Sequence, residues 1–261
     1  MKLHPKILGL LESKRQDLAQ LPTGYAEGLI ARMDGIKRKR GVFRKAIARN
    51  KGEPIRFICE YKPASPSKGD LPAATVEDTV KAYERGGASA ISVLTERHVF
   101  KGGLEFLERA RKATKLPVMR KDFIIDKIEL LEARAFGADA VLLIDGITPR
   151  LGEFIAEADA LGLDCLVESF DAQGAARCVD AGASIVGVNN RDFGDLSTDL
   201  SRAAKAFKDI PEGIVFVAES GVETRADVER YETLDVDALL VGTALMESSQ
   251  PESKLKELRG Q

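Results

Sequence analysis

Glu60 and Lys62 stand two positions apart in the stretch RFICEYKPASPSKGD, and their opposite charges could serve chemistry. The stretch begins like a buried strand and ends in Pro, Ser, Lys and Gly, which is typical of a loop. Because side chains alternate along a strand, Ile58, Glu60 and Lys62 should share one face. Cys59 and Tyr61 should share the other. A carboxylate and an ammonium group at one strand end can move protons or hold a charged ligand.

Polar residues end several other apolar segments in the same way. They are Lys121 in PVMRKDF, Glu168 in DCLVESF, Asn189 and Arg191 in GVNNRD, and Glu219 with Ser220 in GIVFVAES. One such residue alone is often merely solvated, but the whole set favours a shared site. Acids and lysines that converge without histidine indicate proton-transfer chemistry, with the lysines as proton donors or carboxylate partners.

Lys121 has distinctive neighbours in PVMRKDF. Alternation places it on the face of Met119 and Phe123, while Arg120 and Asp122 take the other face. An apolar surrounding disfavours the charged ammonium form, so we expect burial to lower the pKa of this lysine.

The segments AESGVETRADV and LLVGTALM each lead from a strand through a glycine-containing turn towards a helix. Backbone N–H groups in such turns, with the positive end of a helix, attract phosphate. We expect Ser220, Gly221, Gly242 and Thr243 to bind a phosphate group.

Eight β-branched segments, from RFICEYK to DALLVGT, alternate with amphipathic helical segments. This rhythm predicts parallel strands joined by right-handed crossovers, and eight units match an α/β fold of the (β/α)8 TIM-barrel type. An open doubly wound sheet is the alternative, but it often has an early glycine-rich nucleotide loop that this chain lacks. Residues 1–50 read as a helical N-terminal extension folded over one end of the barrel, within a single domain spanning 1–261.

The composition excludes several classes of function. The net charge is −2, from 39 basic and 41 acidic side chains, so neither nucleic acid nor a membrane is an expected partner. The chain has two histidines and three cysteines without a CxxC pair, so no metal site or disulfide framework is indicated. We expect a cytoplasmic protein. A monomer is the expectation, although the sequence does not fix the oligomeric state.

The motifs EYKPASPSKG, LTERHVFKGG, RKDFIID, LVES, GVNNRD, AESGV and LVGTALM follow one another along the chain. In this order they resemble the indole-3-glycerol phosphate synthases of tryptophan biosynthesis. The resemblance implies a lyase that closes the ring of 1-(o-carboxyphenylamino)-1-deoxyribulose 5-phosphate. The products would be indole-3-glycerol phosphate, carbon dioxide and water, and no cofactor or metal would take part.

The resemblance also implies roles for residues. Lys121 would be the general acid, Lys62 the partner of the anthranilate carboxylate, and Glu60 the acid or base for loss of water. Glu168 and Asn189 would stabilise developing positive charge and hold substrate hydroxyls. Substrate contacts would come from Ser65, Phe100, Phe123, Arg191, Glu219, Ser220, Gly221, Gly242 and Thr243.

Two other readings compete with the synthase. A phosphosugar isomerase often uses a cysteine with an aspartate, but Cys59 is expected to face away from the pocket. A barrel without catalysis would bind substrate without turnover, yet it should have lost at least one of the proposed catalytic residues. The chain departs from the family pattern at Pro63, which usually is basic, and at Ser169 and Phe170, where an aliphatic residue and a histidine are common.

Overall fold

Eight parallel strands close into a barrel in the computed structural model, which describes residues 3–35, 40–65, 69–71 and 74–261. Each strand pairs with the next in chain order, and the last, β10, pairs with the first, β1. The predicted (β/α)8 barrel is confirmed and the open sheet is excluded, because no edge is left unpaired. The barrel strands are β1 (Arg56–Tyr61), β4 (Ala90–Leu94), β5 (Val118–Lys121), β6 (Ala140–Ile144), β7 (Asp164–Ser169), β8 (Ile185–Asn189), β9 (Val215–Glu219) and β10 (Ala238–Val241).

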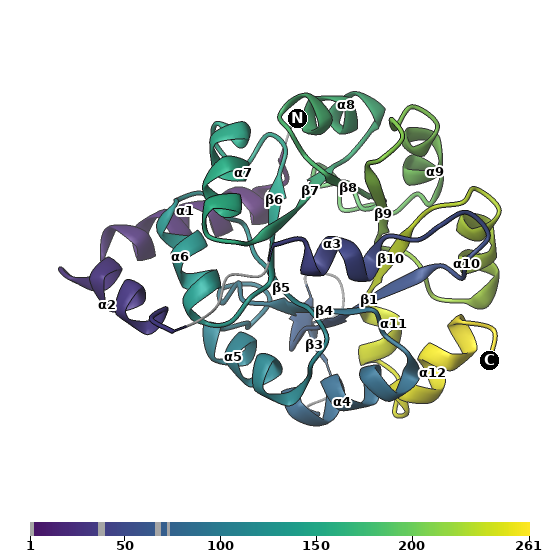
Figure 1. Ribbon diagram of the computed structural model, residues 1–261, viewed down its shortest axis with the longest axis horizontal. Helices are drawn as coiled ribbons and strands as arrows, with labels where there is room; N and C mark the ends of the chain where they lie inside the picture. Colours follow the sequence, from purple (N-terminus) through teal and green to yellow (C-terminus); the bar gives the residue numbers. More distant parts are fainter. Residues whose placement is uncertain (1–2, 36–39, 66–68, 72–73) are drawn as a thin grey trace.

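Helices surround this ring of strands (Figure 1). Thr75, Asp171 and Thr224 cap three of them by accepting a backbone N–H, which satisfies donors that a helix start leaves free. None of the helices in the described ranges is long and apolar enough to cross a membrane. The outer helices are α4 (Val76–Gly86), α5 (Leu104–Ala113), α6 (Ile128–Ala135), α7 (Leu151–Ala160), α8 (Ala172–Asp180), α9 (Ser201–Phe207), α10 (Arg225–Glu232), α11 (Thr243–Met246) and α12 (Pro251–Leu258).

Alternation along the strands divides the core into two layers. Cys59 and Tyr61 point outward into the layer between the barrel and its helices. Ile58 and Met119 point inward into the barrel interior. The predicted facing of the first strand is therefore confirmed, and Cys59 lies away from the barrel mouth, as the case against a cysteine-based isomerase requires.

The N-terminal segment contacts both ends of the barrel. Its first helix, α1 (Pro5–Ala19), lies at the carboxyl ends of the strands, where His4 N–H donates to the Phe193 carbonyl at 2.6 Å. The second helix, α2 (Tyr25–Arg32), packs beside α6 at the periphery. The third, α3 (Val42–Ile47), lies across the centre of the ring of strands in Figure 1. The sequence predicted an extension over one end of the barrel, whereas α1 contacts the carboxyl ends of the strands and α3 contacts their amino ends.

Asp164 holds α3 at the amino end of β7. Its carboxylate accepts the backbone N–H groups of Gly41, Phe43 and Arg44 at 2.8 to 3.1 Å. Phe43 and Ile47 are fully buried in the same cluster as the barrel interior. This helix therefore closes the bottom of the barrel with apolar side chains. The Asp164 carboxylate at the start of β7 satisfies the N–H groups of its first turn.

A buried ion cluster ties α1 to β5 at the opposite end. Lys14 Nζ lies 2.7 Å from Asp122 Oδ1 and 2.6 Å from Glu129 Oε1. Arg120 contacts Asp122 at 3.0 Å and Glu132 at 2.8 Å. Removing one partner of such a cluster leaves an uncompensated buried charge, which costs several kcal/mol. Because the partners of Arg120 and Asp122 come from α1 and α6, both side chains point outward, as alternation predicted.

Truncating the side chain that closes the bottom of the barrel should destabilise the whole fold. We expect Phe43→Ala to lower the free energy of unfolding by about 3–5 kcal/mol, since it removes a buried ring and leaves a cavity. Urea unfolding followed by circular dichroism measures the change. Leu8→Ala, at a side chain 52% exposed, is the matched control and should change stability by about 0.5 kcal/mol or less. Equal effects of the two variants would contradict this role of α3.

Candidate active site

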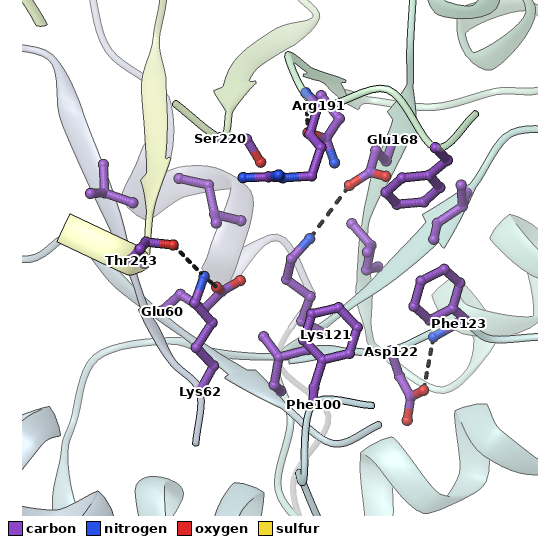
Figure 2. Close-up of a pocket in the computed structure, with 18 of the residues that line it drawn as sticks. Glu60, Lys62, Phe100, Lys121, Asp122, Phe123, Glu168, Arg191, Ser220 and Thr243 are labelled. Carbon is purple, nitrogen blue, oxygen red and sulfur yellow. Dashed lines mark hydrogen bonds and ion pairs between the residues drawn. The ribbon is translucent and has the colours of Figure 1, made fainter. Parts of the chain in front are cut away.

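A pocket opens at the carboxyl ends of the barrel strands, where sites in such barrels are built (Figure 2). The residues that the sequence singled out reach it from every barrel strand except β6, or from the loop that follows the strand. The predicted residues in its wall are Glu60, Lys62, Phe100, Lys121, Phe123, Glu168, Asn189, Arg191, Ser220, Gly242 and Thr243.

Lys121 occupies the centre of the pocket (Figure 2). Its Nζ lies 3.4 Å from Glu168 Oε2 and 3.3 Å from Glu219 Oε2. Burial alone would lower the pKa of Lys121, but the carboxylates of Glu219, Glu168 and Glu60 outweigh it and raise that pKa. The expectation of a lowered pKa was wrong, because it counted the apolar neighbours on the same strand and missed acids arriving from other strands.

Glu219 lies behind Lys121 and is not part of the pocket wall. Only 1% of its surface is exposed. The pKa of Glu219 is raised to about 8, mainly by burial. The negative charge of Glu168 also raises this pKa, and the positive charge of Lys121 opposes the rise. One ammonium group balances one carboxylate charge, so the second carboxyl group retains its proton near neutral pH. Lys121 and Glu219 therefore each hold a proton near neutral pH.

Glycines on neighbouring strands make room for two of the buried carboxylates. A Cβ atom at Gly187 would lie 2.2 Å from Glu219 Oε1, and one at Gly242 would lie 2.4 Å from Glu60 Oε1. Any side chain at these positions would displace the acid. Within the described residues, Glu60, Glu168 and Glu219 each keep one buried carboxylate oxygen without a hydrogen-bond donor. Such oxygens are available to a ligand or to a proton.

Lys62 and Glu60 form a second charged group on the other side of the pocket. Lys62 Nζ lies 3.0 Å from Glu60 Oε1 and donates to Thr243 Oγ1 at 2.9 Å. Figure 2 shows this group across the pocket from Glu168. Lys62 therefore joins the end of the first strand to the turn after the last one.

Asn189 and Arg191 point into the pocket together, whereas Asn190 is buried behind them. Asn189 Oδ1 accepts the backbone N–H of Arg191 at 2.9 Å, and the Arg191 guanidinium donates to the Leu196 carbonyl at 3.1 Å. Asn190 donates to the Ser220 carbonyl and to the Tyr231 hydroxyl. The loop after β8 is therefore fixed from both faces.

Aromatic side chains form one wall of the pocket. The rings of Phe100 and Phe123 lie 6.5 Å apart, and those of Phe123 and Phe193 lie 5.8 Å apart. Phe170, at a departure from the family pattern, packs on Phe193 at 4.7 Å outside the pocket lining. Phe193 was not predicted from the sequence, because its position in RDFGD gives no periodic signal. Ile7, which arrives from α1, was not predicted either.

The predicted phosphate-binding residues divide into two groups. Ser220, Gly242 and Thr243 line the pocket. Gly221 does not line the pocket. Its φ of +85° and the close side chains of Leu200 and Thr198 leave no room for a Cβ atom, so the turn requires glycine at this position. The backbone of Ser65 pairs with Gly69 in a short hairpin of β2 (Ala64–Ser65) and β3 (Gly69–Asp70), but its side chain is not described. The loop tip at 66–68 lies outside the described residues.

Comparison with known proteins points to one family. The pattern of the family described as "Indole-3-glycerol phosphate synthase" matches residues 9–258. A protein of that name from Aquifex aeolicus is 43% identical over 210 residues, covering 78% of this chain and 81% of the relative. Another from Streptomyces griseus is 44% identical over 219 residues, covering 81% and 80%.

Two solved structures show the same fold at low sequence identity. A thiamine phosphate pyrophosphorylase from Pyrococcus furiosus superposes with a TM-score of 0.61 at 18% identity, covering 79% of this chain and 94% of that one. An N-acetylmannosamine-6-phosphate 2-epimerase from Clostridium perfringens gives 0.60 at 15% identity, covering 76% and 89%. These two support the barrel alone. The match over residues 9–258 and the identities of the relatives decide the family: the chain belongs to the indole-3-glycerol phosphate synthases.

Proposed function

We propose that the pocket around Lys121 is where this synthase closes the indole ring. One observation supports this most directly: a lysine whose side chain is 16% exposed stands between two buried carboxyl groups and beside an aromatic wall, at the carboxyl ends of the strands. In the reaction an anthranilate ring carbon attacks the ribulose carbonyl, carbon dioxide leaves, and loss of water completes the indole. Ring closure needs a proton on the carbonyl oxygen, and dehydration needs one proton delivered to the leaving hydroxyl and one removed, whereas carbon dioxide leaves without a proton transfer.

Lys121 is the general acid for ring closure in this proposal. Because its pKa is raised, it enters the reaction protonated, and its ammonium group can donate to the carbonyl oxygen as negative charge develops there. Glu168 and Glu219 hold the ammonium group in place by contacts at 3.4 and 3.3 Å. The proton held by Glu219 lies within reach of Lys121 once the lysine has given up its own.

Glu60 and Lys62 serve the carboxylate and the loss of water. Lys62 Nζ is the cation facing an incoming anthranilate carboxylate, which would compete with Glu60 for the ammonium group. Glu60 keeps one free carboxylate oxygen as the acid or base for dehydration. Glu168 and Asn189 would stabilise positive charge on the intermediate and hold the sugar hydroxyls from the opposite side.

The two ends of the substrate match the two remaining parts of the pocket. Phe100 and Phe123 offer ring faces to the aryl group, with Arg191 at the junction with the sugar. Ser220, Gly221, Gly242 and Thr243 provide hydroxyl and N–H donors for the phosphate, together with Ser65 from the hairpin after β1.

The chain is proposed to act as a single domain and as a monomer in the cytoplasm, without a nucleic-acid partner. The buried contacts of α1 and α3 with the barrel support one folded unit. Among the described residues only Leu8 and Ile30 are large apolar side chains left exposed, which offers little to a second subunit. The net charge of −2 gives no attraction to nucleic acid.

Turnover of the substrate tests the proposed reaction directly. The purified protein is mixed with 1-(o-carboxyphenylamino)-1-deoxyribulose 5-phosphate and EDTA, and indole fluorescence is followed. We expect turnover within a decade or two of about 10 s⁻¹, the median for enzymes. Substrate binding without an indole product would favour the barrel that has lost catalysis.

Replacing the proposed general acid should slow the chemistry itself. We expect Lys121→Ala to lower kcat by about 10²-fold or more, because positioned proton transfer contributes at least that much. Lys127→Ala, at an ammonium group 44% exposed in α6's N-cap, is the control and should leave kcat unchanged. A loss of only a few-fold for Lys121→Ala would remove it from this role.

The proton held by Glu219 should appear in the pH dependence of stability. A carboxyl group whose pKa is raised on folding makes the folded state less stable as pH rises from the unfolded to the folded pKa, here from about 4.5 to about 8. Glu219→Gln removes this titration, so its stability relative to wild type should increase over that window. The slope should not exceed about 1.4 kcal/mol per pH unit.

Urea unfolding of both proteins at pH 5, 6, 7 and 8 measures this difference. Glu223→Gln, at an exposed acid after the same strand, is the control and should show a flat difference. A difference for Glu219→Gln that stays constant or falls with pH would show that Glu219 is ionised throughout.

A further inference from the structure

Glu96 organises the loop that carries Phe100. The loop follows β4, and residues 95–103 form no regular helix or strand. Only 2% of Glu96 is exposed. Its Oε1 accepts the N–H of His98 at 2.7 Å, and its Oε2 accepts those of Val99 at 2.8 Å and Phe100 at 3.0 Å. One carboxylate thus satisfies three successive backbone donors.

Three consecutive N–H groups that converge on one carboxylate form a strong, charge-assisted arrangement. Without the Glu96 carboxylate these N–H groups would need water or another acceptor, because a loop has no neighbouring strand whose carbonyl groups could accept them. The Glu96 carbonyl also accepts the N–H of Gly102 at 2.7 Å. Both ends of the turn are therefore held by the same residue.

The loop packs closely on the carboxyl end of β4. A Cβ atom at Gly102 would lie 2.4 Å from the carbonyl oxygen of Leu94, so no side chain fits there. On the other side, Asp17 of α1 contacts Arg97 at 2.5 Å and His98 at 2.6 Å. The loop is held between β4 and the N-terminal helix, with Glu96 inside it.

The consequence reaches the pocket through Phe100. Its backbone N–H is bonded to Glu96, and its ring lines the pocket beside Lys121 and Phe123 (Figure 2). We propose that Glu96 is a positioning residue of the synthase, which holds Phe100 as the wall for the aryl group of the substrate. This rests on the proposed function of the pocket. Glu96 itself lines the neighbouring cavity under α1 and not the active-site pocket.

The test compares Glu96→Gln with wild type in the turnover assay. In glutamine an NH2 group replaces one carboxylate oxygen, so a donor would face the backbone N–H groups of the loop instead of an acceptor. The loop should therefore lose its ordered conformation. The aryl wall should contact the substrate equally in the ground state and in the transition state, so its loss should affect KM and not kcat. We expect KM to rise about 2- to 12-fold, which corresponds to the energy of one aromatic contact, and kcat to change less than two-fold. Glu105→Gln, the same change at an exposed acid in the next helix, should alter neither constant.

A double-mutant comparison shows whether the effect passes through Phe100. If it does, Glu96→Gln in the background of Phe100→Ala should add less than two-fold to KM. Full additivity would overturn the proposal, as would a loss of kcat at unchanged KM. Should Glu96→Gln not fold, Glu96→Asp keeps the charge but shortens the reach, and a KM equal to wild type would equally overturn it.

Amide hydrogen exchange gives a readout that does not depend on turnover. The N–H groups of His98, Val99 and Phe100 should exchange at least tenfold faster in Glu96→Gln, while those in α5 keep their rates. Unchanged exchange in the loop contradicts the positioning role even if activity falls. If the wild-type protein makes no indole, the proposed reaction is refuted. Faster loop exchange in Glu96→Gln would then still show that the loop depends on Glu96.

Discussion

Side-chain alternation at the end of β5 is the constraint on which both the fold and the site depend. Arg120 and Asp122 point outward into a buried ion cluster with Lys14 of α1, while Lys121 between them points inward to Glu168 and Glu219. A shift of one residue in register would turn each side chain to the opposite face. It would bury Lys121 against the ion cluster and place Asp122 among the carboxylates. The charges on the two faces therefore specify the same register, and they also fix the N-terminal helix to the strand that carries the proposed acid.

Buried charge in the barrel interior is tolerable here because it is nearly balanced. Two lysines, Lys62 and Lys121, face the carboxyl groups of Glu60, Glu168 and Glu219, and the proton retained by Glu219 removes the excess negative charge. The free energy cost of desolvating an unpaired carboxylate is what holds that proton in place. In the proposed reaction the substrate carboxylate would meet Lys62, which contacts Glu60 at 3.0 Å. The charges that stabilise one another in the fold are therefore the ones proposed to receive an anionic ligand.

The sequence predicted the parts of the structure that local patterns determine. Strand and helix rhythm predicted the closed barrel, and period-two alternation placed Glu60, Lys121, Asn189 and Arg191 inward, where the structure has them. It did not predict the direction of the pKa shift of Lys121, because the acids that cause it come from β7 and β9, far along the chain. Nor did it predict Ile7 and Phe193 in the pocket, since a residue in a loop or an extension carries no periodic signal of what it faces. Distant contacts, not local propensity, decide these features.

The loop after β4 shows how such distant contacts serve the reaction. Phe100 was expected from the family resemblance to form an apolar wall, but a phenylalanine in an irregular loop has many conformations open to it, and fixing them costs free energy. Glu96 reduces that cost by binding three N–H groups at once, and Asp17 adds contacts from the N-terminal helix. The helix that the ion cluster fixes to β5 therefore also borders the loop that presents the aryl wall. In this arrangement the extension supports both the proposed acid and the surface against which its substrate lies, so that the barrel alone would hold neither in place as firmly.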